Sequence, residues 1–342
     1  MLKVLDHLPE GFLSVSAAQL QQVLDGPTLI SLPGRQGDAL FVSALLHGNE
    51  DVGLLALQEL LTKYKDTELP RPLTFFVGNV EAAAQGMRFL DHQADYNRVW
   101  PCSELVDSTI IETPEHKMMV EVVQRVTQSG VFASVDMHNN TGLNPHYACV
   151  NRLDDAFLQL ATLFSRTVVY FTRPLGVQSL AMATHCPSVT IECGRTGDGL
   201  GVQHATNYID SLLHLDHFPQ HAVAPGDLDL FHTVAIVKVP REAEFGFGEG
   251  KGDIRFINNL DHYNFSEVES GTLMANTHPD SKIMLDVVSD EGEVLIEHYF
   301  DYADNQIRFK RKVMPSMLTL DENVIRQDCL CYLMERYPLQ RD

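Results

Sequence analysis

Long apolar runs are missing from this chain, and so is any excess of basic residues. None of its apolar segments reaches the roughly 18 residues that a membrane-spanning helix needs. Its 25 Lys and Arg residues stand against 46 Asp and Glu residues, which gives a formal net charge of −21. Nucleic-acid binding requires clustered cationic side chains for the phosphates. We therefore expect neither a membrane protein nor a nucleic-acid-binding protein.

Cysteine is also scarce, and its spacing forms no motif. The six cysteines include no CxxC pair. In a chain of 342 residues this usage is typical of reduced thiols in a cytosolic protein. The first residues carry Asp6 and Glu10 where a secretory signal would be basic and then apolar. These features predict a cytoplasmic protein.

The chain does contain enough apolar material for a large core, with 44% hydrophobic residues. In its first two thirds, short runs rich in Val, Ile, Leu and Phe alternate with longer amphipathic stretches. We predict strands at 28–32, 39–46, 73–77, 133–137, 147–150, 167–171 and 189–193, and helices at 51–64, 114–128, 154–165 and 201–215. This alternation predicts an α/β domain with a mostly parallel central sheet flanked by helices.

The pattern changes near residues 221–227. Beyond this point, short alternating stretches at 233–239, 283–288, 294–298 and 307–310 predict a smaller β-rich domain. We therefore divide the chain into residues 1–222 and a β-rich C-terminal domain of residues 223–342. The segment GFGEGKG lacks the strand–loop–helix context of a phosphate-binding loop, so we predict a flexible loop there.

Two histidines and two glutamates fall near the carboxyl ends of predicted strands. The strand at 39–46 leads into HGNE (47–50), the strand at 133–137 leads into His138, and the strand at 189–193 contains Glu192. Open α/β sheets bind their ligands at this edge. Two His and one carboxylate form a standard catalytic zinc set, with water in the fourth position. HxxE alone is more often a polar loop, so the hypothesis depends on the conjunction of His47, Glu50, His138 and Glu192.

Glu192 lies inside the otherwise apolar segment VTIECG. Burying a carboxylate is costly unless it is paired or functional. Its pKa can rise in such a place, which suits a general base that later acts as an acid. For His138 a structural, hydrogen-bonded role is the alternative, and the unmatched histidines such as His185 are predicted to be structural or exposed.

Arg88, Asn97 and Arg98 form a second polar cluster after the strand that ends before Asn79. The planar fork of Arg matches a carboxylate with two hydrogen bonds. A loop with two solvated cations explains the same residues equally well.

Taken together, these motifs resemble the succinylglutamate desuccinylase/aspartoacylase family, which is similar in fold to the zinc carboxypeptidases. The matching segments follow the family's order over about residues 40–200: HGNE (47–50), GN (78–79), Arg88 with DYNR (95–98), DMHNNTG (136–142) and IECG (191–194). The resemblance implies that His47, Glu50 and His138 bind zinc, and that Glu192 is the general base and acid.

The resemblance also implies roles in substrate binding. Arg88 matches the arginine that polarises the scissile carbonyl, and Asn97 and Arg98 match the pair that holds the substrate's α-carboxylate. We place Asn79 with the substrate-binding residues as well. Aspartoacylases carry an Arg ten residues before the catalytic Glu, whereas this chain has Met182. Arg195 is a candidate substitute for that charge, with a surface role as the alternative.

We therefore predict a zinc-dependent hydrolase with one zinc ion per chain that cleaves the amide bond of a small N-acyl amino acid. Cobalt or manganese are alternative metals for such a site. A metallocarboxypeptidase or peptide amidase is the nearest alternative function, and a non-catalytic zinc-binding module is the alternative from another class. The sequence leaves open the acyl group, the amino acid and the formation of homo-oligomers.

Overall fold

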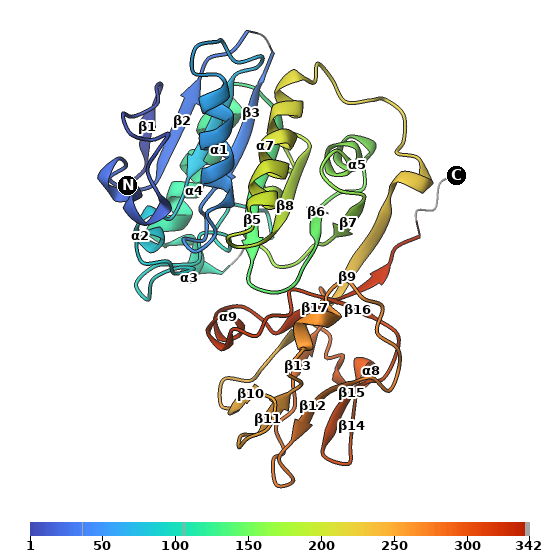
Figure 1. Cartoon of the computed structure of the whole chain (residues 1–342). Coiled ribbons are helices and arrows are strands. Elements are labelled where there is room, and N and C mark those ends of the chain that lie inside the picture. Colours follow the sequence, from blue (N-terminus) through green and yellow to red (C-terminus); the bar gives the residue numbers. More distant parts are fainter. Residues whose placement is uncertain (36, 105–106, 339–342) are drawn as a thin grey trace. The chain divides into compact units, whose positions relative to one another are not determined.

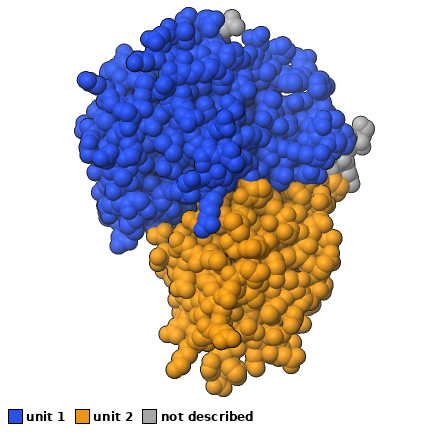
Figure 2. All heavy atoms as spheres, viewed as in Figure 1, with its two compact units in different colours: residues 1–139, 146–229 blue, residues 140–145, 230–342 orange. Residues whose placement is uncertain are grey.

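The computed structural model describes residues 1–35, 37–104 and 107–338. The chain divides into two compact units, which are coloured separately in Figure 2. Unit 1 comprises Met1–Asn139 and His146–Asp229, and unit 2 comprises Asn140–Pro145 and Leu230–Asp342. The short segment Asn140–Pro145 therefore belongs to unit 2, although unit 1 both precedes and follows it in the sequence.

Unit 1 is built on a mixed sheet whose strands lie in the order β1-β2-β4-β3-β5-β8-β6-β7. Figure 1 shows this sheet, with most of its strands labelled. The strands are β1 (Lys3–Leu5), β2 (Thr28–Leu32), β3 (Ala39–Ala44), β4 (Leu73–Val77), β5 (Val131–Asn140), β6 (His146–Val150), β7 (Thr167–Tyr170) and β8 (Ser188–Arg195). The pairs β1–β2, β3–β4, β3–β5 and β6–β7 are parallel, whereas β2–β4 and β6–β8 are antiparallel. β3 and β4 are buried along their whole length, as their continuous apolar sequences predict.

Helices flank this sheet. They are α1 (Val52–Lys63), α2 (Val80–Ala83), α3 (Ser108–Ile111), α4 (Pro114–Gln128), α5 (Asp155–Thr162), α6 (Gln178–Met182) and α7 (Gly199–His214), with short 3₁₀ turns η1 (Ala17–Gln22) and η2 (Pro225–Asp227). α1 and α7 pack side by side (Figure 1). Gly53 of α1 lets this helix approach β3 and β5 closely, because a Cβ there would lie 2.8 Å from the Cβ of Ala44 and 3.2 Å from that of Met137.

α4 packs against side chains of β2, β3 and β4 through an apolar cluster that contains Phe41, Phe76 and Trp100. The helix begins with Pro114 after Thr113, whose side chain accepts a hydrogen bond from the amide of His116. Both features are favourable at a helix N-terminus. The fully buried Trp100 lies edge-on to Phe76, with ring centroids 6.0 Å apart.

Unit 2 is rich in β-structure. Its elements are β9 (Asp229–Lys238), β10 (Phe245–Phe247), β11 (Ile254–Phe256), η3 (Leu260–Tyr263), β12 (Leu273–Thr277), β13 (Asp286–Val288), α8 (Ile296–Tyr299), β14 (Phe300–Ala303), β15 (Gln306–Phe309), β16 (Met314–Ser316), α9 (Glu322–Gln327) and β17 (Cys331–Arg336). One sheet has the order β10-β11-β12-β15-β14, and β9 pairs with β13 and β17, which in turn pairs with β16. The core between them includes Phe256, Ile307 and Phe309.

One expectation for this unit is wrong, and the structure adds detail to a second. The predicted strand at 294–298 is wrong, because α8 forms at Ile296–Tyr299 and only Val294 makes an isolated bridge. The glycine-rich segment between β10 and β11 folds around the guanidinium of Arg255, which donates hydrogen bonds to the carbonyls of Phe247, Gly248, Glu249 and Lys251. A single cationic side chain thus organises the backbone of the loop that we predicted to be flexible.

The fold class is confirmed: a large central sheet flanked by helices accompanies a separate β-rich C-terminal sheet. In the part of the chain that the structure describes, no helix has the length and apolar character needed to cross a membrane. All six cysteines lie in described segments, and all are free thiols.

Candidate metal centre and active site

The turn after β3 places His47 and Glu50 at the edge of the sheet. Leu45 adopts a left-handed backbone conformation there, with φ of 54°. Gly48 follows where a side chain has no room, since a Cβ would lie 2.3 Å from the amide nitrogen of Ala83. The turn brings Nδ1 of His47 to 2.9 Å from Oε1 of Glu50, close to the start of α1.

β5 supplies the next pair of polar residues. Residues two apart in a strand share a face, so Asp136 and His138 point to the same side of β5. Ser43 is aligned with Asp136 in the neighbouring strand β3 and donates its hydroxyl to Oδ1 of Asp136 at 2.6 Å. His138 Nε2 lies 2.8 Å from Oδ2 of the same carboxylate. The fully buried Asp136 therefore fixes the orientation of the His138 ring.

Glu50 lies between the two histidines. Its Oε1 contacts Nδ1 of His47, and its Oε2 lies 2.7 Å from Nδ1 of His138. All three side chains are buried, and one ligand atom from each lies within 4.8 Å of the others. The structure thus brings together three residues that are 3 and 88 positions apart in the chain.

An aspartate contacts the outer nitrogen of each imidazole. His47 Nε2 lies 3.1 Å from Oδ1 of Asp95, and His138 Nε2 lies 2.8 Å from Oδ2 of Asp136. A carboxylate at Nε2 accepts the Nε2–H and leaves the Nδ1 lone pair available to a cation. Since Nδ1 of both rings faces Glu50, the donor set fits a divalent metal ion such as zinc.

Charge interactions outweigh burial at the centre of this cluster. Burial raises the pKa of Glu50, but the imidazoles of His47 and His138 bring this pKa well below its usual range. Burial lowers the pKa of His138, but Asp136 and Glu50 carry it well above its usual range. The Glu50 carboxylate is therefore ionised at neutral pH, and in the protein without metal a proton on His138 helps to balance its charge.

Arg88 lies beside the donor set and is held by Asp95. Its Nε donates to Oδ2 of Asp95 at 3.2 Å, its Nη2 lies 3.1 Å from the same oxygen, and its Nη1 lies 3.8 Å from Oε1 of Glu50. Burial raises the pKa of Asp95, but Arg88 and His47 lower it well below its usual range. One carboxylate thus orients both His47 and Arg88.

Asn97 reaches into the same cluster. Its Oδ1 accepts a hydrogen bond from the amide of Gln178 at 3.0 Å, and its Nδ2 lies 3.3 Å from Oδ2 of Asp136 and 3.1 Å from Nε2 of His138. With the Nε2–H of His138 directed at Asp136, the Asn97 amide donates to Asp136. Arg98 is half-buried, and its Nη1 donates to the carbonyl of Asn97 at 2.8 Å.

Asn79 and Arg195 occupy different surroundings. Asn79 is fully buried; its Oδ1 caps α2 by accepting from the amide of Ala82, and its Nδ2 donates to Oε1 of Gln93 at 2.9 Å. Gln93 also accepts from the amide of Leu90, so Asn79 supports the loop that follows Arg88 in the sequence. Arg195 is exposed at the end of β8.

Glu192 lies on β8, the neighbour of β5 in the sheet, and only 8% of it is exposed. Thr190 is two residues before Glu192 in β8, so the two side chains lie on the same face of the strand. The hydroxyl of Thr190 donates to Oγ of Ser179 in α6 at 2.9 Å, so this face is the one that α6 covers. Gln178 of the same helix donates its side-chain Nε2 to Oγ of Ser134. Ser134 lies on the face of β5 that also carries His138. Glu192 and His138 therefore lie on the same face of the sheet, on adjacent strands.

Neither Asp95 nor Asp136 was predicted to have a role in the site. Asp136 was detectable, because in a strand a residue two positions before His138 must share its face. Asp95 was not detectable from local spacing, since it is 48 positions from the His47 ring that it contacts.

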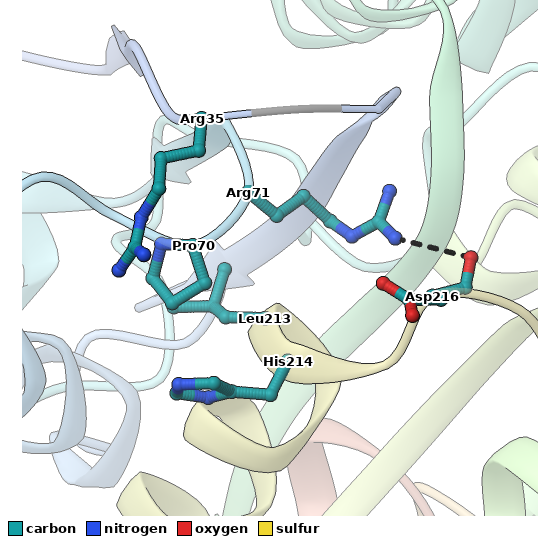
Figure 3. Close-up of a pocket in the computed structure, with 6 residues that line it drawn as sticks. All are labelled: Arg35, Pro70, Arg71, Leu213, His214 and Asp216. Atoms are coloured by element: carbon teal, nitrogen blue, oxygen red, sulfur yellow. Dashed lines mark hydrogen bonds between the residues drawn. The ribbon is translucent and has the colours of Figure 1, made fainter.

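A separate cavity of about 340 Å³ is lined by Arg35, Pro70, Arg71, Leu213, His214 and Asp216 (Figure 3). None of these residues belongs to the donor set. Arg71 donates to the carbonyls of Asp38 and Leu215, each at 2.7 Å, and its guanidinium lies 3.8 Å from the ring centroid of Phe132. The Leu215 carbonyl is one of those left without an intrahelical partner where α7 ends. Arg71 therefore serves as a capping cation for this helix.

The sequence matches a known family model. Residues 36–209, just over half of the chain, match the succinylglutamate desuccinylase/aspartoacylase catalytic domain. No curated protein matches the sequence.

Solved structures share the fold over most of the chain. The succinylglutamate desuccinylase from Chromobacterium violaceum is 15% identical, with a TM-score of 0.59, over 90% of this chain and 87% of that one. The succinylglutamate desuccinylase/aspartoacylase from Rhodobacter sphaeroides is 17% identical, with a TM-score of 0.59, over 91% and 89%. Murine aminoacylase 3 is 14% identical, with a TM-score of 0.52, over 89% and 96%. At these identities the likeness shows the fold alone.

Proposed function

The chain belongs to the succinylglutamate desuccinylase/aspartoacylase family, as its motifs predicted, and we propose that it is a zinc-dependent hydrolase of small N-acyl amino acids. The family consists of deacylases, so an amide-cleaving enzyme is the expected class. The reaction proposed is hydrolysis of the amide bond that joins an acyl group to the amino group of an amino acid.

One observation carries the proposal. Nδ1 of His47 and Nδ1 of His138 both face the Glu50 carboxylate, while an aspartate holds Nε2 of each ring. Two imidazoles and one carboxylate, with further carboxylates that contact the outer nitrogen of each imidazole, suit a catalytic zinc ion whose fourth coordination position is open to water. A zinc ion held there would act as a Lewis acid and lower the pKa of a coordinated water to about 7. Cobalt and manganese remain alternatives for this donor set.

Glu192 is the proposed general base and acid. It is almost fully buried on the same sheet face as His138, one strand away. In this role a carboxylate oxygen of Glu192 takes a proton from the attacking water and returns it to the nitrogen of the leaving amine. Arg88, kept in place by Asp95, donates to the carbonyl oxygen as negative charge develops there.

The proposed grip on the substrate's carboxylate comes mainly from Arg98. Its guanidinium is half-buried and is oriented by the carbonyl of Asn97. The side chain of Asn97 already contacts Asp136 and Gln178, so we assign it the task of holding this region in place beside Arg98. We propose that Asn79 contributes indirectly, through the loop after Arg88, and that the exposed Arg195 attracts the anionic substrate.

Two further proposals concern the domain boundaries and the cellular compartment. We propose residues 1–222 as the catalytic domain and residues 223–342 as the β-rich C-terminal domain. We propose the cytoplasm as the compartment, because six free thiols suit a reducing environment.

The direct test is a hydrolysis screen of N-succinyl amino acids, N-acetyl amino acids and dipeptides, with protein whose metal content has been measured. Cleavage of an N-acyl amino acid by the zinc-loaded protein, and its loss on chelation, is the expected result. Preferred cleavage of dipeptides would instead indicate a metallocarboxypeptidase. Bound zinc without hydrolysis of any substrate would indicate a non-catalytic zinc-binding module.

Glu192→Gln tests the role of the base. The amide keeps the size of the side chain but cannot take up a proton, so we expect zinc binding to persist and kcat to fall by about 10²–10⁴-fold. Glu121→Gln, which removes an exposed carboxylate paired with Arg125 on α4, is the matched control and should retain full activity. Near wild-type turnover in Glu192→Gln would assign the proton transfer to another group.

A further inference from the structure

Asn139 follows His138 directly, but its side chain points to the other face of β5. It is 98% buried, since only 2% of the residue is exposed. A buried amide must find partners for both its oxygen and its nitrogen. Asn139 finds them on two other segments of the chain, and each segment carries a residue of the proposed active site.

The oxygen of Asn139 contacts the segment that follows Glu50. The amide of Val52, the first residue of α1, donates to Oδ1 of Asn139 at 3.0 Å. The first amides of a helix have no partner within the helix, and the side chain of Asp51 at the N-cap does not cap them. Asn139 therefore caps α1 from a different element, and it fixes the start of the helix two residues after Glu50.

The nitrogen of Asn139 contacts the segment that follows Glu192. Its Nδ2 donates to the carbonyl of Gly194 at 3.4 Å. Gly194 lies two residues after Glu192 near the end of β8, with a left-handed backbone (φ 76°), and a Cβ there would lie 2.9 Å from Nε2 of His146. The backbone at this point is thus closely confined, and the Asn139 amide is one of the contacts that confine it.

We propose that Asn139 is a positioning residue for the reaction: one planar amide fixes the metal ligand Glu50 and the general base Glu192 relative to each other. The inference rests on the proposed function for the roles of these two carboxylates. Asn139 acts on them through the backbone that follows each, at Val52 and Gly194. Displacement of reacting groups by about 1 Å can cost about 100-fold in rate, so the loss of this bridge affects turnover even when the fold persists.

Two substitutions separate the halves of the bridge. Asn139→Ala removes both hydrogen bonds. Asn139→Asp keeps an acceptor for the Val52 amide, and its negative charge is favourable at a helix N-terminus, but it has no donor for the Gly194 carbonyl. Asn151→Ala is the matched control, because Asn151 is also a buried asparagine of unit 1 whose Nδ2 donates to a carbonyl, that of Phe171 at 3.1 Å.

Hydrogen exchange in the metal-free protein gives a readout that is independent of activity. We expect the Val52 amide to exchange about tenfold faster in Asn139→Ala, and to stay protected in Asn139→Asp and in Asn151→Ala. Unchanged protection of Val52 in Asn139→Ala would show that the amide does not depend on Asn139, and would overturn the proposal.

Kinetics on the zinc-loaded enzyme supply the second readout. We expect kcat to fall by about 10–100-fold in both Asn139 variants, with KM unchanged, whereas Asn151→Ala lowers only the melting temperature. An unchanged kcat per folded molecule in both Asn139 variants, with lower melting temperature alone, would reduce Asn139 to a purely structural role. If Asn139→Ala does not fold, the isosteric Asn139→Asp decides. A wild-type protein that hydrolyses nothing would refute the proposed function, while the exchange measurement would still test the bridge.

Discussion

Asp136→Asn is expected to weaken zinc binding without disturbing the fold. Asp136 is fully buried and has three partners: the hydroxyl of Ser43 at 2.6 Å, the His138 ring at 2.8 Å and the amide of Asn97 at 3.3 Å. Asparagine has the same shape but no charge. Because the Ser43 hydroxyl can turn to accept from the new amide nitrogen, the remaining oxygen can still face His138.

The size of the effect follows from the charge that is lost. A hydrogen bond to a charged group contributes about 1.5–3 kcal/mol and one between neutral groups about 0.5–1.5 kcal/mol. The difference, about 1–1.5 kcal/mol, corresponds to roughly a tenfold loss of zinc affinity. Adding Ser43→Ala removes the partner that orients the new amide, so its nitrogen can face His138 and favour the tautomer with Nδ1 protonated. We expect the double variant to lose affinity further, within the range of about 10–100-fold typical of such partners.

Competition with a chromophoric chelator at fixed pH measures these affinities, and circular dichroism monitors the fold. Asp154→Asn is the matched control, since this exposed aspartate forms an ion pair with Arg152 and is not part of the donor set. Wild-type zinc affinity in both Asp136→Asn and the double variant would refute the view that Asp136 orients His138.

Three further predictions concern stability and are measured by chemical denaturation. Gly48→Ala should lower the free energy of unfolding by about 1–3 kcal/mol and weaken zinc binding, because the new Cβ would lie 2.3 Å from the amide nitrogen of Ala83. A wild-type free energy of unfolding and wild-type zinc affinity in this variant would show that the turn can relax. Asp210→Asn should cost about 1 kcal/mol at pH 7, since Asp210 contacts Lys63 at 2.6 Å. Burial raises the pKa of Asp210, but its hydrogen bonds to Lys63 and Tyr64 lower it below the unfolded-state value. The stability that Asp210 contributes is therefore present above about pH 4 and is lost as the pH falls through its folded-state pKa. A difference in stability between the variant and the wild type that persists at pH 2 would contradict this. Trp100→Ala should cost about 3–5 kcal/mol and Trp100→Phe clearly less, because the indole nitrogen has no hydrogen-bond partner among the described residues; equal losses would contradict this reasoning.

Short-range patterns predicted most of the first unit. The strands at 28–32 and 73–77 coincide with β2 and β4, and the helix at 114–128 coincides with α4. These segments are long or strongly apolar, so local pattern and burial favour the same structure. The segment at 294–298 was misjudged because its five residues, three apolar and then two polar, fit one helical turn as well as a strand, and only the surrounding packing selects between them.

The candidate donor set was predictable because it follows strands that carry strong sequence signals. His47 and His138 come directly after apolar runs, and the sheet order places β3 beside β5. The interactions that orient these rings were harder to foresee. Asp95 contacts His47 across 48 positions of sequence, and Asn139 contacts Val52 across 87.

The sequence by itself determined which residue types stand at the ends of the strands, the fold class and the family to which the chain belongs. It did so because strand periodicity, the apolar pattern that predicts burial and the order of the motifs can all be read along the linear sequence. Only the tertiary structure decided that Nδ1 of both histidines faces Glu50, and that one asparagine joins the segments after Glu50 and Glu192. Hydrogen-bond direction depends on the three-dimensional positions of donor and acceptor, and these are set only when distant segments pack together.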